Sequence, residues 1–228
     1  MKVLLFIIAA IAAYLITGWN SSITFAKVLY HDDIRKRGSG NPGFTNFRRV
    51  YGKKYSWVIF GLDIGKAAFC ILLFGLLFRT MAGDVYDKTA MYQIGAAYTG
   101  VFCMLGNMYP LWYQFKGGKG YLVSLTVILC LNPLAAVIGF IVTVVLMLTL
   151  NYMSLATMCG NIVGVILLGV FHFGNGMQPI AMVLAVLCVV MMIIRHSQNI
   201  MRLIQGTESK SEFTLIDKVN ALFGKNKG

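Results

Sequence analysis

The chain has 228 residues, of which 58% are hydrophobic and 12% are charged, and its formal net charge is +12. A soluble domain of this size carries about 25% charged residues, so the composition excludes an ordinary soluble protein. The positive charge is confined to a few polar segments, which excludes a general nucleic-acid-binding surface. Basic segments beside a membrane favour anionic headgroups and anionic substrates. We therefore expect membrane lipid as a partner and no nucleic acid.

Apolar stretches recur along the whole chain and predict an all-α integral membrane protein with seven transmembrane helices. The first stretch resembles a signal peptide, but no small-residue cleavage site follows it, so it is interpreted as a retained span. The stretch 120–150 is too long for one crossing, and Asn132-Pro133 divides it into two spans; without that break there would be six. The other expected spans cover about residues 3–25, 55–78, 91–111, 154–173 and 178–194.

Lysine and arginine are distributed unequally between the loops. The loop 27–54 holds eight of them, whereas the loop 79–90 holds two, against two aspartates. Because lysine and arginine gather on the cytoplasmic side of membranes, the first loop is predicted to be cytoplasmic. The N-terminus then lies outside and the C-terminus inside. Alternation places three further polar segments on the cytoplasmic side: 112–120, 151–154 and 195–228. Residues 1–228 are interpreted as one membrane domain, of which residues 206–228 form a cytoplasmic tail.

The cysteines and histidines show no metal-binding pattern. All five cysteines fall in apolar stretches and none forms a C-x-x-C pair, so they are interpreted as buried free thiols. The three histidines lack the spacing of metal ligands. We therefore expect no metal at a functional site.

The first polar loop combines glycines, small polar residues and arginines within residues 35–49. Its glycines allow backbone N–H groups to converge on an anion, and Arg49 offers two parallel donors to a phosphate. A flexible connector with positive-inside bias would explain the arginines and glycines but not the density of small polar side chains. The loop therefore predicts a phosphate site, with candidate residues Gly38, Ser39, Gly40, Asn41, Thr45, Asn46 and Arg49.

Residues 115–120 read Phe-Lys-Gly-Gly-Lys-Gly and directly precede an apolar stretch. Glycines and lysines at a helix N-terminus predict an anion site, because the helix dipole adds to the lysine charge. The segment is not a Walker A loop, since G-x-x-x-x-G-K-[ST] is absent and no strand precedes it. A juxtamembrane anchor would explain the two lysines equally well, so both interpretations stay open for Gly117, Gly118 and Lys119.

The last apolar stretch leads into a third polar segment. If the final helix continues inward, His196, Asn199 and Arg202 recur at i, i+3 and i+6 and share one face. Such a face, with donors and an acceptor, suits a polar substrate. The alternative is a capped helix end with Gly206 as its stop, and Arg195 is interpreted as an interfacial anchor.

Asp63 and Lys66 lie one turn apart inside the second expected span. Ionisable residues within a span are costly and usually face a polar interior, so a pair that supports the site is the default hypothesis. A local ion pair with a structural role is the alternative. Ser154 is a weaker candidate, because serine commonly caps a helix.

These segments, in this order and at these separations, resemble the bacterial acyl-phosphate:glycerol-3-phosphate acyltransferases, the PlsY family. The resemblance extends over nearly the whole chain. It is carried by Asp33-Ile34-Arg35 leading into residues 38–43 with Thr45, Asn46 and Arg49, by residues 115–120, and by His196 with Asn199, Ile200, Arg202 and residues 206–208.

The resemblance implies a seven-span protein of the bacterial cytoplasmic membrane with its active site on the cytoplasmic side. It implies transfer of a fatty acyl group from acyl phosphate to the 1-hydroxyl of glycerol 3-phosphate. The products are lysophosphatidate, for phospholipid biosynthesis, and phosphate; no cofactor takes part. We also expect a monomer.

By the same resemblance, Ser39, Arg49 and Lys119 hold phosphate groups, while His196 and Asn199 line the glycerol 3-phosphate site. The other expected substrate-binding residues are Gly38, Gly40, Asn41, Thr45, Asn46, Gly117, Gly118, Ser154, Arg202 and Glu208, with Asp63 and Lys66 in support. The general base is expected to be either His196 or the phosphate of the substrate itself.

The chain departs from the family pattern at several positions. Phe44 replaces a small alanine, Asn107 replaces a usual histidine, and Tyr121 begins Tyr-Leu-Val where the family usually has Val-Ala-Thr. Two other functions stay open: a transporter or channel for an organic phosphate, and an inactive relative, which Asn107 and Tyr121 favour. A transporter would favour internal repeats, and the sequence contains none.

Overall fold

The computed structural model describes residues 2–172 and 176–211. Within these residues the regular elements are all helices, joined by loops, and there is no β-strand. The α-helices are α1 (Lys2–Gly18), α2 (Ser21–Tyr30), α3 (Phe44–Tyr51), α4 (Ser56–Arg79), α5 (Lys88–Met108), α6 (Tyr121–Leu131), α7 (Pro133–Leu150), α8 (Met153–His172), α9 (Pro179–Arg195) and α10 (Ser197–Ile204). Two short 3-10 helices lie in the loops, η1 (Ile34–Lys36) and η2 (Leu111–Tyr113).

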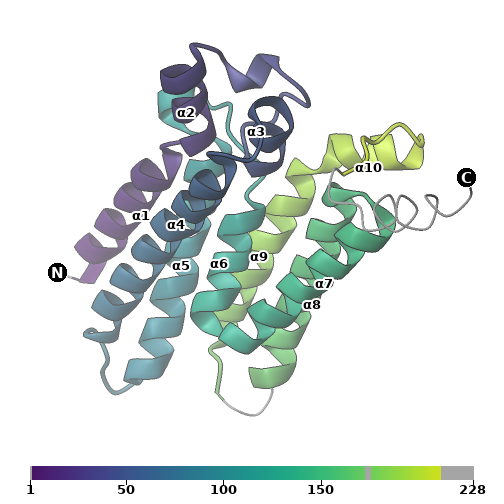
Figure 1. The fold of residues 1–228 in the computed structure, drawn as a ribbon. Coiled ribbons are helices and arrows are strands. Elements are labelled where there is room, and N and C mark those ends of the chain that lie inside the picture. Colours follow the sequence, from purple (N-terminus) through teal and green to yellow (C-terminus); the bar gives the residue numbers. More distant parts are fainter. Residues whose placement is uncertain (1, 173–175, 212–228) are drawn as a thin grey trace, which may run out of the picture.

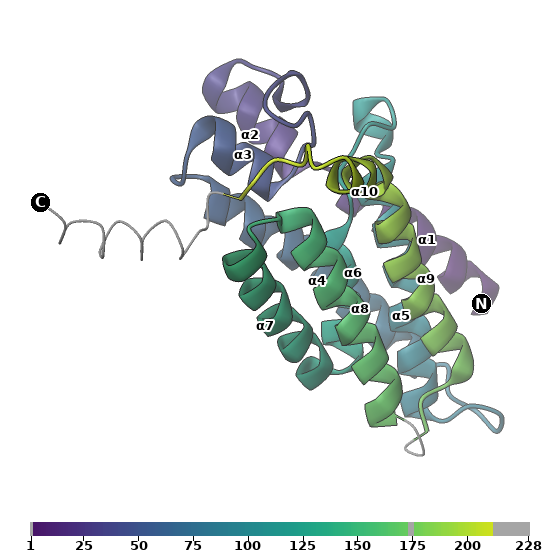
Figure 2. The same ribbon diagram turned by 90° about the vertical axis from the view of Figure 1, so that its right-hand side faces the viewer.

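The long helices form a bundle in which they lie side by side (Figure 1). Helix α5 lies at its centre and packs against α1, α4, α6 and α9, while α7 packs mainly against α8. Small residues allow these close approaches: a Cβ added to Gly106 of α5 would collide with the backbone oxygen of Tyr14 in α1. The short helices α2, α3 and α10 gather at one end of the bundle, as a second view shows (Figure 2).

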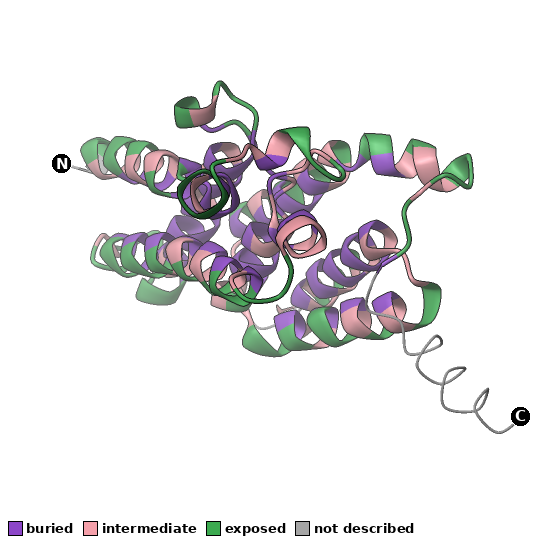
Figure 3. Ribbon diagram, turned by 45° about the horizontal axis from the view of Figure 1, so that its top comes forward, coloured by how far each residue is buried: buried purple, intermediate pink, exposed green. Residues whose placement is uncertain are grey.

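Four stretches among the described residues are long and apolar enough to cross a membrane: Val3–Tyr30, α4, α7 and α8, with the bent pair of α9 and α10 as a fifth candidate. Exposed residues lie on the outward faces of the bundle and buried residues between the helices (Figure 3). Exposed side chains on these faces include Ile11, Leu76 and Ile141, the apolar residues that a lipid-facing surface requires.

Each of the seven expected spans coincides with a helix, but not every helix has the length of a full crossing. Helix α6 has 11 residues. At a rise of 1.5 Å per residue it is about 16 Å long, shorter than the hydrocarbon core of about 30 Å. The fold is therefore all-α with several membrane-crossing candidates, and the number seven stays a prediction.

The predicted break at Asn132-Pro133 is confirmed. Helix α6 ends at Leu131 and α7 begins at Pro133, where the missing backbone N–H of proline costs nothing. The side chain of Asn132 caps α7 by accepting a hydrogen bond from the backbone nitrogen of Ala135 at 3.0 Å.

The first expected span is confirmed as a crossing candidate, Val3–Tyr30, but its helix is interrupted. Helix α1 ends at Gly18 and α2 begins at Ser21. Asn20 between them has an extended backbone, and its side chain caps α2 by accepting a hydrogen bond from the backbone nitrogen of Ile23 at 2.9 Å. Asparagine competes with the helix for backbone hydrogen bonds in this way, which favours a new helix start over continuation.

Asp63 and Lys66 of α4 satisfy the polar groups at this interruption. The Lys66 ammonium lies 2.8 Å from Asp63 Oδ1 and donates to the backbone oxygen of Trp19 at 2.6 Å. Asp63 also accepts a hydrogen bond from the Ser21 hydroxyl at 2.9 Å. A buried ion pair is favourable only with such additional hydrogen bonds. The pair therefore joins α4 to the α1–α2 junction, which agrees with the structural alternative.

The last helix continues beyond its apolar stretch as α10, but with a break at His196. Between α9 and α10 the axis bends by 54°. The His196 ring lies 2.8 Å from the backbone oxygen of Met192, the acceptor that the backbone nitrogen of His196 would use in a continuing helix. That nitrogen instead donates to Ile193 at 2.9 Å, which tightens the turn.

Candidate active site

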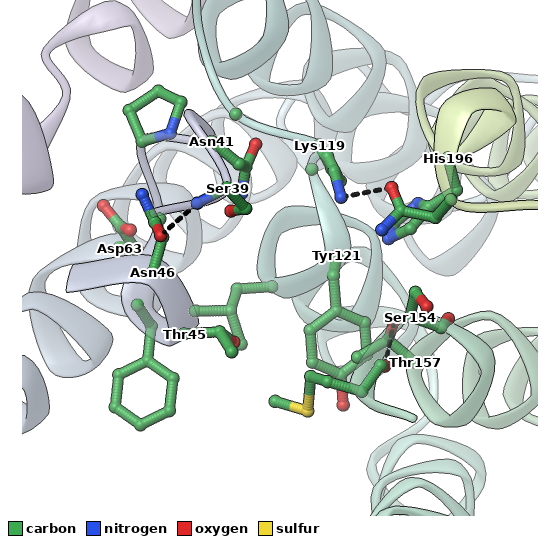
Figure 4. A pocket seen from close by; sticks show the side chains of 18 of the residues that line it. Ser39, Asn41, Thr45, Asn46, Asp63, Lys119, Tyr121, Ser154, Thr157 and His196 are labelled. Atoms are coloured by element: carbon green, nitrogen blue, oxygen red, sulfur yellow. Dashed lines mark hydrogen bonds between the residues drawn. The ribbon is translucent and has the colours of Figure 1, made fainter. Parts of the chain in front are cut away.

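A cavity of about 140 Å³, referred to below as the cleft, lies at the end of the bundle where α3, α6, α8 and α10 begin (Figure 4). The structure brings together most of the expected site residues in its lining: Ser39, Asn41, Thr45, Asn46, Arg49, Asp63, Gly118, Lys119, Ser154, His196, Asn199, Arg202 and Glu208. An adjoining cavity of about 540 Å³ adds Gly40 and Gly117. Gly38 and Lys66 line neither cavity. The polar segments expected to share one membrane face therefore meet at one site.

The side chain of Asn46 holds the first glycine loop in shape. Its Oδ1 accepts a hydrogen bond from the backbone nitrogen of Ser39 at 2.9 Å, and its Nδ2 donates to the backbone oxygen of Arg37 at 2.9 Å. Gly38 has a φ of 55°, a conformation that favours glycine, and a Cβ there would collide with Asn46 Oδ1. Asn46 was expected to contact substrate, but its amide is occupied within the loop.

The glycine amides do not form the expected backbone cradle for an anion. The N–H groups of Gly40, Gly43, Gly117 and Gly118 donate to the backbone oxygens of Arg37, Asn41, Met108 and Asn107, respectively. The protons of Gly40 and Gly43 are used within the first loop, and those of Gly117 and Gly118 bind the end of α5, so the N–H groups of Gly40 and Gly43 do not converge on an anion as expected for the first loop. The glycines instead permit tight turns: a Cβ on Gly117 would collide with the backbone oxygen of Asn107.

Helix N-termini at the cleft add the partial positive charges of their backbone N–H groups to the charges of the lysine and arginine side chains. Phe44, Tyr121 and Met153 are the first residues of α3, α6 and α8, and all three line the cleft. His196, the residue before α10, lines it as well. Helices α3 and α6 have no side-chain cap. Partial positive charge at a helix N-terminus favours a bound anion.

A hydrogen-bond network joins the second and third motifs. The Lys119 ammonium donates to Asn199 Oδ1 at 2.5 Å, and Asn199 Nδ2 donates to Glu208 Oε1 at 2.6 Å. Glu208 also accepts hydrogen bonds from Ser154 Oγ at 2.7 Å and from Arg202 Nε at 2.8 Å. Residues from a loop, two helices and the segment after α10 are thereby held around one point.

Burial and charge shift the pKa values of this network. Burial lowers the pKa of Lys119 to about 8; nearby Glu208 opposes the shift and the neighbouring arginines add to it. Burial acts to raise the pKa of Glu208, but hydrogen bonds from Arg202, Asn199 and Ser154 outweigh it, and the net shift is downward. At neutral pH the site therefore holds a protonated lysine beside an ionised carboxylate.

His196 is a buried neutral imidazole at neutral pH. Burial, with the nearby Lys119 charge as a smaller contribution, lowers its pKa to about 4. Because a carbonyl oxygen only accepts, the ring nitrogen facing Met192, Nδ1, carries the proton. This leaves Nε2 as the acceptor.

Arg195 is a site residue that the sequence interpretation missed. It was interpreted as an interfacial anchor, yet its guanidinium donates to the backbone oxygens of Gly117 at 3.3 Å and Gly118 at 3.4 Å and lies 5.0 Å from the Tyr109 ring centre. It therefore holds the loop that carries Lys119. No sequence signal separates such a contact from an anchor, since both place an arginine at a helix end.

The far side of the cleft is apolar. Phe44 and Phe60 line it from α3 and α4, and Leu122 and Met153 line it from α6 and α8. A cleft with cations at one side and apolar walls at the other suits a molecule with an anionic head and a hydrocarbon chain.

Comparison with known proteins indicates the family of the chain. The family model described as glycerol-3-phosphate acyltransferase matches residues 7–206. The chain belongs to this family. Glycerol-3-phosphate acyltransferases from Thermoanaerobacter sp. and Aquifex aeolicus are 33% and 34% identical to it, covering 90% and 88% of this chain and 94% and 96% of their own lengths. The glycerol-3-phosphate acyltransferase 2 of Bacillus anthracis is 34% identical over 90% of this chain and 98% of its own length.

Two crystal structures of PlsY, an integral membrane glycerol 3-phosphate acyltransferase, share the fold. The glycerol 3-phosphate form is 32% identical, with a TM-score of 0.78 over 90% of this chain and 94% of that one. The lysophosphatidic acid form is 30% identical, with a TM-score of 0.75 over 91% of this chain and 96% of that one. This glycerol-3-phosphate acyltransferase family member is thus a multi-pass membrane enzyme.

Proposed function

We propose that this protein transfers a fatty acyl group from acyl phosphate to the 1-hydroxyl of glycerol 3-phosphate, giving lysophosphatidate and inorganic phosphate. The observation that carries the proposal is the cleft, in which Lys119, Arg49 and Arg202 lie on the polar side and apolar walls on the other. Both substrates are anions and one has a hydrocarbon chain. The relatives are named for glycerol 3-phosphate acylation, and the two PlsY structures are named for substrate and product forms.

Positioning and charge supply the catalysis in this proposal. Two phosphates side by side repel each other, so a site that holds both requires several positive groups. Ser39, Arg49, Lys119 and Arg202 contact the phosphate groups, and the N-termini of α3 and α6 add their partial charges. His196 and Asn199 line the glycerol part. Holding both reactants in the cleft makes the step effectively unimolecular.

Acyl phosphate is a mixed anhydride, so the reaction requires no metal, cofactor or covalent intermediate in this proposal. The glycerol oxygen forms a bond to the acyl carbon, and the bond between that carbon and the phosphate oxygen breaks, with phosphate leaving with the electron pair. The hydroxyl proton goes to a base. A His196 pKa of about 4 makes its Nε2 a weak base, which favours a phosphate oxygen of the substrate as the acceptor.

We also propose the finer topology: seven spans in the bacterial cytoplasmic membrane, with the cleft on the cytoplasmic side, in a monomer. The start of α1 and helix α10 lie at opposite ends of the bundle, which agrees with termini on opposite sides (Figure 1). The cytoplasmic side supplies the soluble substrate, and the lipid bilayer receives the product.

The direct test uses purified protein with hexadecanoyl phosphate and glycerol 3-phosphate, measuring phosphate and lysophosphatidate together. We expect equal amounts of both products, and we expect Lys119→Ala and Arg49→Ala each to lower kcat/KM at least about tenfold. Lys53→Ala, an exposed cation outside the cleft, is the matched control. Phosphate without lysophosphatidate would indicate a hydrolase. No lysophosphatidate at any chain length would favour the transporter or the inactive relative.

A further inference from the structure

Two large aromatic side chains line the cleft and have no part in the proposed chemistry. Phe44 begins α3 and Tyr121 begins α6. We infer that these two rings select the acyl group by its shape next to the carbonyl, admitting straight chains and rejecting chains with a branch at the first few carbons. The inference rests on the proposed function, since it concerns the acyl donor of that reaction.

Tyr121 lies where the start of an acyl chain has to pass. It follows Lys119 by two residues, so its backbone lies next to the phosphate end of the cleft. Its ring points away from Lys119, toward Thr157 (Figure 4). An acyl phosphate with its head at Lys119 therefore has its first carbons beside the Tyr121 ring and the apolar Met153.

Neither ring is free to move aside. The Phe44 ring lies 5.2 Å from the Trp57 ring and 5.3 Å from the Phe60 ring, centre to centre, so two aromatic neighbours on α4 hold it. The Tyr121 ring packs against the hydrophobic core of the bundle, and its backbone oxygen, which accepts a hydrogen bond from Asn161 of α8 at 3.3 Å, fixes the start of α6. Because packed interiors yield little, the two rings act as fixed walls.

The size of the cavity limits the selection to the start of the chain. Its volume is about 140 Å³. A cavity of about 150 Å³ holds one benzene molecule, so a whole fatty chain cannot fit inside this one beside the phosphate groups, and only its first carbons reach the two rings. The rest of the chain has to lie outside, along exposed apolar side chains of α4 and α8 such as Val58 and Ile162. The rings therefore select donors by the shape of the acyl chain near its carbonyl group, and they do not select by total chain length.

The test compares two acyl donors of the same chain length, hexadecanoyl phosphate and 3-methylhexadecanoyl phosphate, each with glycerol 3-phosphate. A single methyl group that does not fit an apolar site changes kcat/KM by about tenfold or more. We expect the wild type to prefer the straight donor by about this factor. Tyr121→Val and Phe44→Ala should each lower the preference at least about threefold, mainly through faster turnover of the branched donor.

Two further variants separate ring size from other effects. Tyr121→Phe keeps the ring and loses the hydroxyl, so it should keep the wild-type preference. Phe102→Val removes a comparable ring from α5, outside the cleft, and should also keep it. If Tyr121→Val does not yield folded protein, Phe44→Ala alone decides the outcome.

Three results would overturn the inference: equal turnover of both donors by the wild type, an unchanged preference in Tyr121→Val and Phe44→Ala, or a preference lost in Tyr121→Phe. Failure of the proposed function looks different, because the wild type would then form no lysophosphatidate from the straight donor. The two failures are therefore distinguishable within one experiment.

Discussion

Burial of Lys119 disfavours the charged ammonium that its proposed phosphate-binding role requires. Its place beside Asn199 in a desolvated cleft makes its charge available to a ligand, but the same burial lowers its pKa to about 8. A bound phosphate would stabilise the protonated form. The lysine is therefore charged in neutral solution and lies within reach of mild alkaline titration.

This predicts a pH dependence of substrate capture. Below pH 8 Lys119 carries its charge, and as the pH rises through about 8 the charge is lost, so kcat/KM for acyl phosphate should fall on the alkaline side. Lys119→Arg, which stays charged, should flatten this fall. Arg195→Gln should move it to higher pH, because the Arg195 charge helps to lower the Lys119 pKa. A wild-type kcat/KM that stays constant between about pH 7 and pH 9 would contradict the assignment.

Glu208 shows a second residue-scale principle, that a carboxylate can organise a site built for anions. Its hydrogen bonds with Ser154, Asn199 and Arg202 join the segment after α10 to the helices around the cleft. It lies in the expected tail, residues 206–228, so the first part of that tail belongs to the site. The rest, residues 212–228, lies outside the described residues.

At the scale of the elements, the site is built from interruptions of helices. The α1–α2 junction presents Asn20, whose side-chain amide donates to the backbone oxygen of Pro42 at 3.0 Å and so positions the first glycine loop. The α9–α10 bend turns His196 and the residues after it across the end of the bundle. The first interruption therefore supports a loop of the cleft, and the second brings His196 into its lining.

The second glycine loop predicts a sharp effect of one methyl group. Gly117→Ala should place a Cβ against the backbone oxygen of Asn107 and displace the loop that carries Lys119. We expect kcat/KM to fall at least about tenfold, since small misplacements of a binding group are costly. Gly61→Ala on α4, where an added Cβ meets nothing within 4 Å, is the matched control and should retain activity. Equal activities of the two variants, measured as lysophosphatidate formation, would contradict this role of the loop.

At the scale of the whole molecule, the bundle places all of its polar motifs at one end. Segments 39–49, 118–123, 153–157 and 196–209 all contribute to one cleft. The apolar outer faces suit contact with lipid, so we expect a lipid substrate to approach from the side and a soluble one from the end.

Topology can be measured at the two ends of the chain. With seven spans, a green fluorescent protein fused after residue 228 should fluoresce in the cytoplasm, and a cysteine added at the N-terminus should react with an impermeant maleimide applied from outside. Six spans would place both ends on one side. A C-terminal fusion outside the cell, or an N-terminus protected in intact cells but labelled after lysis, would contradict the predicted orientation.

Much of this could be read from the sequence, because the signals were local. Apolar stretches marked the helices, and Asn132-Pro133 marked a true helix boundary since proline and a capping asparagine act on their own neighbours. Charge bias grouped the polar segments, and the order of the motifs indicated the family. These local signals were enough to select the candidate site residues, and most of them line the cleft.

What only the tertiary structure decided depends on partners distant in sequence. The contact of Asn20 with the first glycine loop and the role of Arg195 depend on Pro42 and on the Gly117 and Gly118 carbonyls, which no local pattern reveals. The glycine amides of the first loop looked available for an anion until the fold showed them closing their own turns. The sequence thus determined which polar residues interrupt the apolar chain, because that depends only on the order of residues along the chain. The fold decided which of their donors still face the cleft, because each donor binds whichever acceptor packing brings near.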